Sequence, residues 1–167
     1  MPTDTDATWQ LVATERHRLA DDLDQLTDDQ WGTQSQCDAW TVEELGSHLV
    51  TPFETSTPRF IFAMLRARGN FDRAIIALTA RVHAKYRRAA AIEKLREHAD
   101  NRWTPPKAGP GLMLAEVVVH GQDIRRVVGM DHDVPAETIR IALEAMDDPE
   151  VRADYARRIG VPVPTVG

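Results

Sequence analysis

A carboxylate and an imidazole lie one helical turn apart in the segment 112–128, LMLAEVVVHGQDIRRVV. Glu116 and His120 are four residues apart, so on a helix both side chains point to the same face. Asp123 follows three residues later and returns to that face. The three valines at 117–119 make this helix apolar, and a buried carboxylate needs a partner. That partner is either the histidine itself, in a hydrogen bond that orders the core, or a bound cation.

His48 is expected on an earlier helix and would supply a second imidazole for a cation. Two histidine nitrogens and one carboxylate oxygen, at about 2.0–2.2 Å from the ion, suit zinc and leave one position open for water or substrate. Nickel or iron would accept the same set, so the residue types alone do not choose the metal. An open position is typical of catalytic rather than structural zinc sites.

Helical spacing of apolar residues dominates the chain and places these groups on separate helices. Thr5 or Asp6 can cap a first helix, and Thr41 with Glu44 forms a T-x-x-E capping box that starts a second one. Pro52 is expected to bend or restart the second helix, and the stretch 27–40 is expected to be a loop. The four main helical regions are predicted at 5–26, 41–65, 71–99 and 112–128, with a break near 85–88 in the third.

The predicted fold is an all-α, up-and-down four-helix bundle with one or two short extra helices after Gly129, in a single domain spanning 1–167. Bundles build metal and ligand sites in their centre from residues on facing helices. The long separation between His48 and Glu116 fits this arrangement, because the intervening helices can fold back and bring the two together.

Composition narrows the classes of partner. The chain has 167 residues, 43% of them hydrophobic and 28% charged, and a formal net charge of −6. This charge argues against a nucleic-acid groove or an anionic membrane as partner. The single cysteine, Cys37, excludes an intrachain disulfide, and the N-terminal residues are too polar for a signal peptide. The sequence predicts a soluble, cytoplasmic protein.

Three more residues near the candidate ligands invite a role. Asp123 is expected to orient His120 or to pair with an arginine, rather than to act as a fourth ligand. Arg125 and Arg126 can hold a substrate carboxylate with two hydrogen bonds each, or simply stabilise the C-terminal end of their helix through its dipole.

Two blocks carry a resemblance to a known family. SQCDAWTVEELGSHL (35–49) and LAEVVVHGQDIRRVVG (114–129) resemble the two signatures of the mycothiol-dependent maleylpyruvate isomerase N-terminal domain family, a branch of the DinB-like superfamily. The resemblance implies a four-helix bundle, often a homodimer, whose metal ligands fall on His48, Glu116 and His120. It also implies that the thiol mycothiol binds with its sulfur at the open metal position.

The chemistry implied is thiol activation. A metal deprotonates a coordinating thiol and gives a nucleophile at neutral pH, which would attack a small electrophile in a transferase or isomerase reaction. Two alternatives remain: a metal-dependent hydrolase with water at the open position, and a non-catalytic helical module that binds metal. Hydrolysis calls for a general base near the site, and Asp123 is the one spare candidate on the ligand face.

Overall fold

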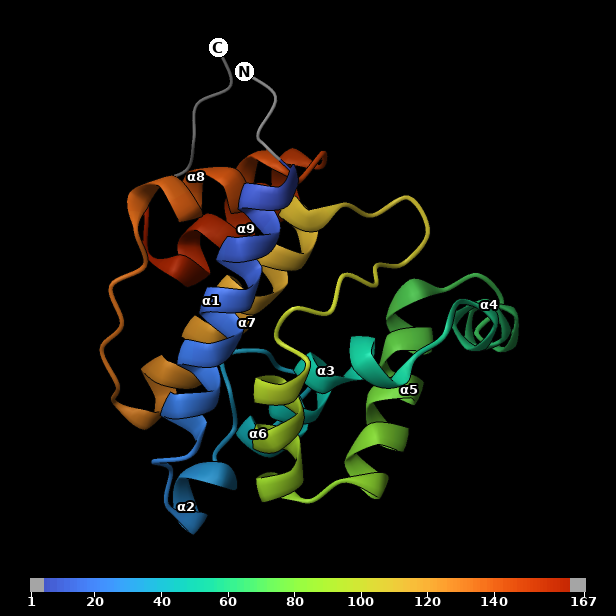
Figure 1. Cartoon of the computed structure of the whole chain (residues 1–167), viewed down its shortest axis with the longest axis horizontal. Helices are drawn as coiled ribbons and strands as arrows, with labels where there is room; N and C mark the ends of the chain where they lie inside the picture. The colour runs from blue at the N-terminus through green and yellow to red at the C-terminus, as the bar shows by residue number, and fades with distance from the viewer. Residues whose placement is uncertain (1–4, 163–167) are drawn as a thin grey trace.

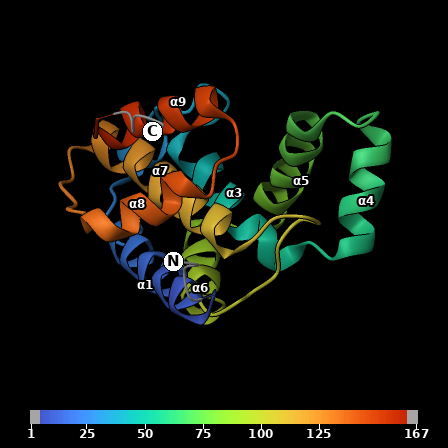
Figure 2. The same ribbon diagram turned by 90° about the horizontal axis from the view of Figure 1, so that it is seen from above.

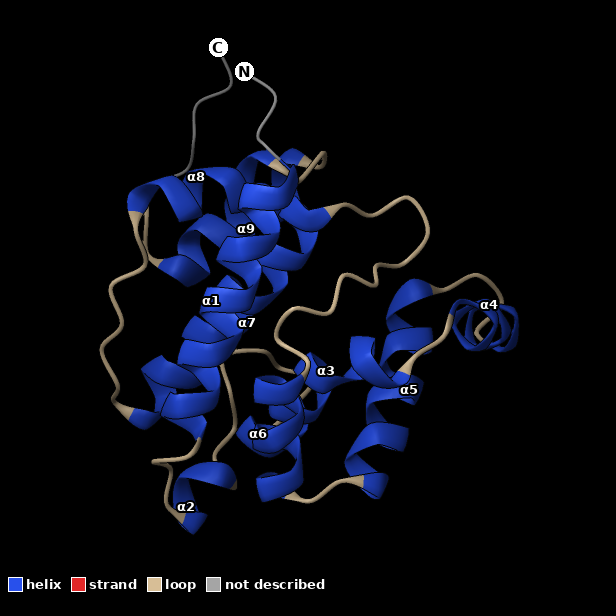
Figure 3. Ribbon diagram, in the orientation of Figure 1, coloured by secondary structure: helices blue, strands red, loops and turns tan. Residues whose placement is uncertain are grey.

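Nine helices follow one another through residues 5–162, the part of the chain that the computed structural model describes (Figure 3). Within this range there is no strand, and one isolated bridge joins Gln34 to Thr41. The helices are α1 (Thr5–Leu23), α2 (Asp28–Trp31), α3 (Val42–Glu54), α4 (Thr57–Arg66), α5 (Phe71–Lys85), α6 (Arg88–Glu97), α7 (Pro110–Val128), α8 (Ala136–Glu144) and α9 (Pro149–Ile159).

Four of these helices form the bundle. α1 packs against α6 and α7, and α3 packs against the same two helices, so the four close around a common core. α8 and α9 cover the other side of α7, while α5 packs on α3 and carries α4 away from the bundle (Figures 1 and 2). The all-α bundle with two additional C-terminal helices predicted from the sequence is confirmed.

The helices do not simply alternate in direction, which refines the up-and-down order predicted above. α1 and α7 run the same way, because Leu19 lies beside Gly121 and Asp22 beside Arg125. α3 and α6 also run in parallel, since Glu43 pairs with Arg88 near the start of both helices and Glu54 with Lys94 towards their ends. The cause is α5, which lies outside the bundle and carries the chain back between α3 and α6.

Local differences from the expected boundaries have simple causes. The stretch predicted as a loop contains α2, which Thr27 and Gln30 start with a capping box of their own. Pro52 lies inside α3 rather than at a break, and the helix continues to Glu54 before the chain turns into α4. The predicted interruption near 85–88 is present, between α5 and α6.

α7 is the central helix, and its position explains why it carries the buried polar groups. Pro110 occupies its first turn and Gly129 ends it in the left-handed conformation, with φ 74°. Neighbouring helices contact it from several directions, so most side chains from Met113 to Arg125 are buried. None of the helices in the described range is long and apolar enough to cross a membrane.

An ion-pair cluster joins the end of α3 to α5 and α6. Glu54 accepts hydrogen bonds from Lys85 Nζ at 2.8 Å, and Lys94 Nζ lies 3.1 Å from its other oxygen. Partial burial opposes ionisation of this carboxyl, but hydrogen bonds from the two lysines and from Tyr86 outweigh it and lower the pKa of Glu54 to about 2. The cluster therefore stabilises the fold only while Glu54 is ionised.

Glu54→Gln is expected to lower the free energy of unfolding by about 1 kcal/mol at neutral pH, since the group lies near the surface. The folded-state pKa lies below its ordinary value of 4.5, so this contribution is complete above pH 4.5 and disappears as the pH falls toward 2. Urea unfolding at several pH values should show the variant losing less stability than wild type between pH 5 and 2. Glu93→Gln, which alters an exposed glutamate of α6, is the matched control and should track wild type. Parallel acid profiles for wild type and Glu54→Gln would contradict the prediction.

Candidate metal centre

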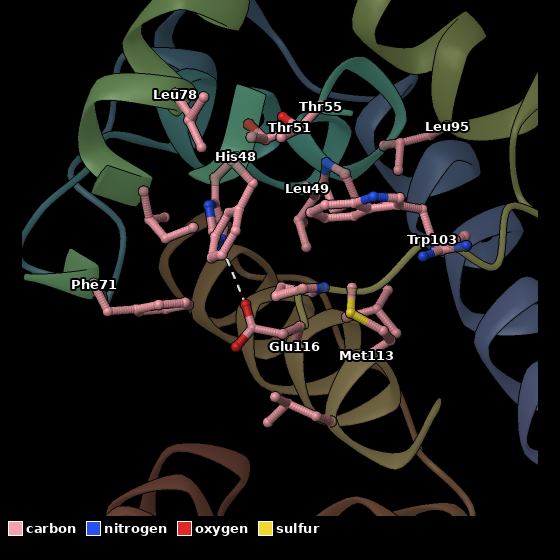
Figure 4. Close-up of a pocket in the computed structure, with 17 residues that line it drawn as sticks. His48, Leu49, Thr51, Thr55, Phe71, Leu78, Leu95, Trp103, Met113 and Glu116 are labelled. Carbon is pink, nitrogen blue, oxygen red and sulfur yellow. Dashed lines mark hydrogen bonds and ion pairs between the residues drawn. The ribbon is translucent and has the colours of Figure 1, made fainter. Parts of the chain in front are cut away.

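The three side chains singled out in the sequence converge between α3 and α7. One ligand atom from each of His48, Glu116 and His120 lies within 4.8 Å of the others. Oε2 of Glu116 is 3.1 Å from Nε2 of His48 and 3.4 Å from Nε2 of His120. Figure 4 shows the His48 ring and the Glu116 carboxylate pointing toward each other across the two helices.

The outer nitrogen of each imidazole has a separate partner. His48 Nδ1 lies 3.2 Å from Thr79 Oγ1 of α5, and His120 Nδ1 lies 3.0 Å from Asp123 Oδ2. Asp123 is fully buried and also accepts a hydrogen bond from Nε of Arg158, at 3.0 Å. Such partners fix the orientation of a ligating histidine and leave its other nitrogen free for a cation.

Two more side chains enclose the cluster. The Trp40 ring stacks on the His48 ring, with centroids 4.5 Å apart and planes at 18°. The Tyr155 hydroxyl donates to the second oxygen of Glu116 at 3.4 Å. The residues around the cluster come from other parts of the chain: Thr79 from α5, Tyr155 and Arg158 from α9, and Trp40 from the loop before α3. Sequence spacing within α7 therefore gave no signal for any of them.

The charge states within the cluster balance around Glu116. Burial opposes ionisation of this carboxyl, yet hydrogen bonds from His120 and His48 prevail and hold its pKa well below the usual range. Burial lowers the pKa of His48, whereas at His120 the hydrogen bonds to Asp123 and Glu116 overcome burial and raise the pKa. Without a cation, a protonated His120 therefore supplies the positive charge beside Glu116.

The donor set fits a divalent transition metal. A metal needs neutral imidazoles and ionised carboxylates, and His48 and Glu116 are already in those states. His120 would release its proton when a cation takes over the neutralisation of Glu116. No fourth His, Cys, Asp or Glu joins the cluster among the residues described, so the arrangement matches a three-ligand site with an open position.

A mostly apolar cavity of about 90 Å³ borders the cluster. His48 and Glu116 form part of its wall, and Figure 4 shows them with Leu49, Leu78 and Met113 around the same space. The wall contains a single further ionisable group within the described part of the chain, the guanidinium of Arg16. The cavity can therefore hold a small apolar molecule beside His48 and Glu116.

Arg125 and Arg126 are used inside the fold instead of facing this cavity. Nε of Arg125 is 2.7 Å from a carboxylate oxygen of Asp22 on α1, and the side chain is almost fully buried. Nη2 of Arg126 donates to the carbonyl of Ile159 at 2.8 Å, at the end of α9. Neither lines the cavity. Both arginines lie past His120, on faces of α7 turned to α1 and α9, and a substrate-binding role for them stays a prediction.

The candidate site lies in a part of the chain that matches a known protein family. The family model for the mycothiol maleylpyruvate isomerase N-terminal domain matches residues 12–125, well over half of the chain. The matched range contains His48, Glu116 and His120 but stops before α8 and α9. Searches of curated proteins and of solved structures returned no match. The chain thus belongs to the mycothiol maleylpyruvate isomerase N-terminal domain family.

Proposed function

We propose that His48, Glu116 and His120 bind a divalent cation, with zinc the best fit, and that the protein activates a low-molecular-weight thiol such as mycothiol. The activated thiol would be transferred to a small electrophile or would isomerise it. The observation that carries the proposal is the meeting of two imidazole nitrogens and one carboxylate oxygen beside an apolar cavity. Membership of a mycothiol-related family supports the choice of thiol.

The chain's own residues would prepare this site in distinct ways. Thr79 and Asp123 orient the two imidazoles, and Tyr155 holds the Glu116 oxygen that faces away from the histidines. Trp40 covers one face of His48 and excludes water from it. When bound, a cation supplies the positive charge that favours the thiolate form of a coordinating thiol at neutral pH.

The cavity favours thiol transfer over hydrolysis. A hydrolase needs a general base within reach of the attacking water. Within the described range, the ionisable groups of the cavity wall are His48, Glu116 and Arg16. His48 and Glu116 are assigned to the metal ion, and the positively charged guanidinium of Arg16 is no general base. An apolar wall instead suits an electrophile held against the thiol with little water present.

The direct test is a calorimetric titration of zinc-loaded protein with mycothiol and with S-methyl mycothiol. We expect saturable binding of the free thiol that is at least about tenfold tighter than binding of the methylated form, because only the thiol can ionise. His48→Ala should abolish this preference. The control is His83→Ala, which removes a histidine of α5 that is hydrogen-bonded to Ser47, the neighbour of His48 on α3. This variant should keep the preference for the free thiol.

Two results would count against the proposal. Equal affinity for the thiol and its methyl derivative would show that sulfur does not reach the cation. Turnover of simple esters by zinc-loaded protein without any thiol would point to the hydrolase instead.

A further inference from the structure

Arg16 of α1 carries a buried positive charge that no carboxylate neutralises at contact distance. The residue is only 3% exposed, and the described residues give it no acidic ion-pair partner. Burial outweighs the more distant attraction of Asp100 and lowers the pKa of Arg16 to about 10. The other deeply buried arginine in the bundle, Arg125, is by contrast paired with Asp22.

One nitrogen of the Arg16 guanidinium is hydrogen-bonded to the backbone. Nη1 donates to the carbonyls of Ala99 and Asn101, at 2.8 and 2.7 Å, and so satisfies backbone groups just past the end of α6. The Phe53 ring lies beneath the guanidinium, 4.9 Å from its central carbon. These contacts hold the group in a fixed orientation, and they occupy a single nitrogen.

The opposite edge, formed by Nε and Nη2, has no protein acceptor among the described residues. This is the edge that binds a carboxylate through two parallel hydrogen bonds. It is not sealed off: within the described part of the chain, the one fully enclosed side-chain nitrogen or oxygen that lacks a partner is Nη2 of Arg125. Arg16 also lines the cavity that His48 and Glu116 border.

The cavity thus connects the guanidinium of Arg16 to the candidate metal centre. Phe53, beneath Arg16, follows His48 by five residues on α3, which corresponds to about 7.5 Å along the helix axis. The cavity wall between Arg16 and His48 is made largely of apolar side chains, which include Leu49, Leu95 and Trp103. A ligand that satisfies both ends needs an anionic head and a short apolar body.

We propose that Arg16 binds the carboxylate of a short apolar acid whose body lies in the cavity and points toward His48 and Glu116. A cavity of about 150 Å³ holds benzene, so about 90 Å³ accommodates roughly four apolar heavy atoms, or an acid of about four to six carbons. This assigns the class of electrophile for the proposed function and depends on that function for the reaction. The binding itself requires no cation.

The test compares pentanoate with its neutral counterpart pentanamide, using the 167-residue chain treated with EDTA. Chemical-shift titration at pH 7.5, followed at the amides near Asn101 and Trp103, yields both dissociation constants. We expect pentanoate to bind about tenfold more tightly, as a charge-assisted pair of hydrogen bonds exceeds a neutral one. This comparison in the native chain does not depend on any variant folding.

Substitution then locates the recognition. Arg16→Lys keeps the charge but removes the two-nitrogen edge, so the preference for the acid should fall below about threefold while the affinity for pentanamide stays the same. Arg152→Lys is the matched control, because Arg152 also donates to a backbone carbonyl, that of Met146, away from the cavity. Its preference should equal that of wild type.

Equal binding of acid and amide by the native protein, or no saturable binding of either, would overturn the proposal. An acid preference that persists in Arg16→Lys would overturn it as well. Since the protein is metal-free throughout, none of these outcomes bears on thiol activation. Conversely, a failed thiol titration leaves the carboxylate result standing.

Discussion

Glu116→Gln is expected to lower the affinity for Zn²⁺ by at least about 100-fold. Glu116 is the one anionic member of the cluster and lies between both histidines, so the substitution removes the negative charge and a strong oxygen donor together. Loss of a group that merely supports a ligand already costs 10–100-fold in metal affinity, and loss of a ligand should exceed that range. The amide matches the carboxylate in size, so the fold should persist.

Competition with a fluorescent zinc chelator gives the affinity, and elemental analysis of purified protein gives the occupancy. His48→Ala should show the same loss from the other helix. Glu137→Gln, which alters an exposed glutamate on α8, should retain wild-type affinity. Near-stoichiometric zinc in both Glu116→Gln and His48→Ala would remove the metal centre from consideration, and so would zinc-free native protein after zinc addition.

Asp123→Asn is expected both to destabilise the protein and to weaken zinc binding. The Asp123 side chain is fully buried and contacts His120 on one side and Arg158 on the other. Removing one partner of a buried ion pair costs about 3–5 kcal/mol, and we expect about 2–3 kcal/mol here because Arg158 is partly exposed and can turn to solvent. Zinc affinity should fall about 10- to 100-fold, since His120 loses the carboxylate that orients its ring.

Urea unfolding of metal-free protein and chelator competition separate the two effects. Asp154→Asn is the matched control: Asp154 also approaches Arg158, at 3.5 Å, but lies half-exposed on α9. It should change neither quantity appreciably. A large loss of stability in Asp123→Asn with unchanged zinc affinity would restrict Asp123 to a purely structural role.

The sequence predicts the parts of this site that depend on spacing along one helix. Glu116 and His120 are placed by the four-residue repeat of α7, and the capping box of Thr41 and Glu44 places the start of α3. Their approach to His48 depends on how α3 packs against α7. Ligand chemistry and the bundle architecture predicted that pairing, and the family signature pointed to the same residue.

The surroundings of the site were not predictable in this way, because they depend on how helices pack. Thr79 and Tyr155 reach the cluster from helices whose docking the sequence does not encode locally. The charged run at 15–18 resembles a solvated face, yet Glu15 and Arg16 are almost completely buried. In isolation, such a run does not reveal which of its members turn inward.

One consequence follows from the origin of Tyr155 and Arg158. Both lie on α9, beyond residue 125 where the family match ends, yet they contact Glu116 and Asp123 on α7. The residues that would bind an ion and these two supporting residues thus lie in different portions of the polypeptide. In the proposed metal centre, substitutions confined to α9 would therefore alter the strength or the metal preference of binding, while His48, Glu116 and His120 stay unchanged.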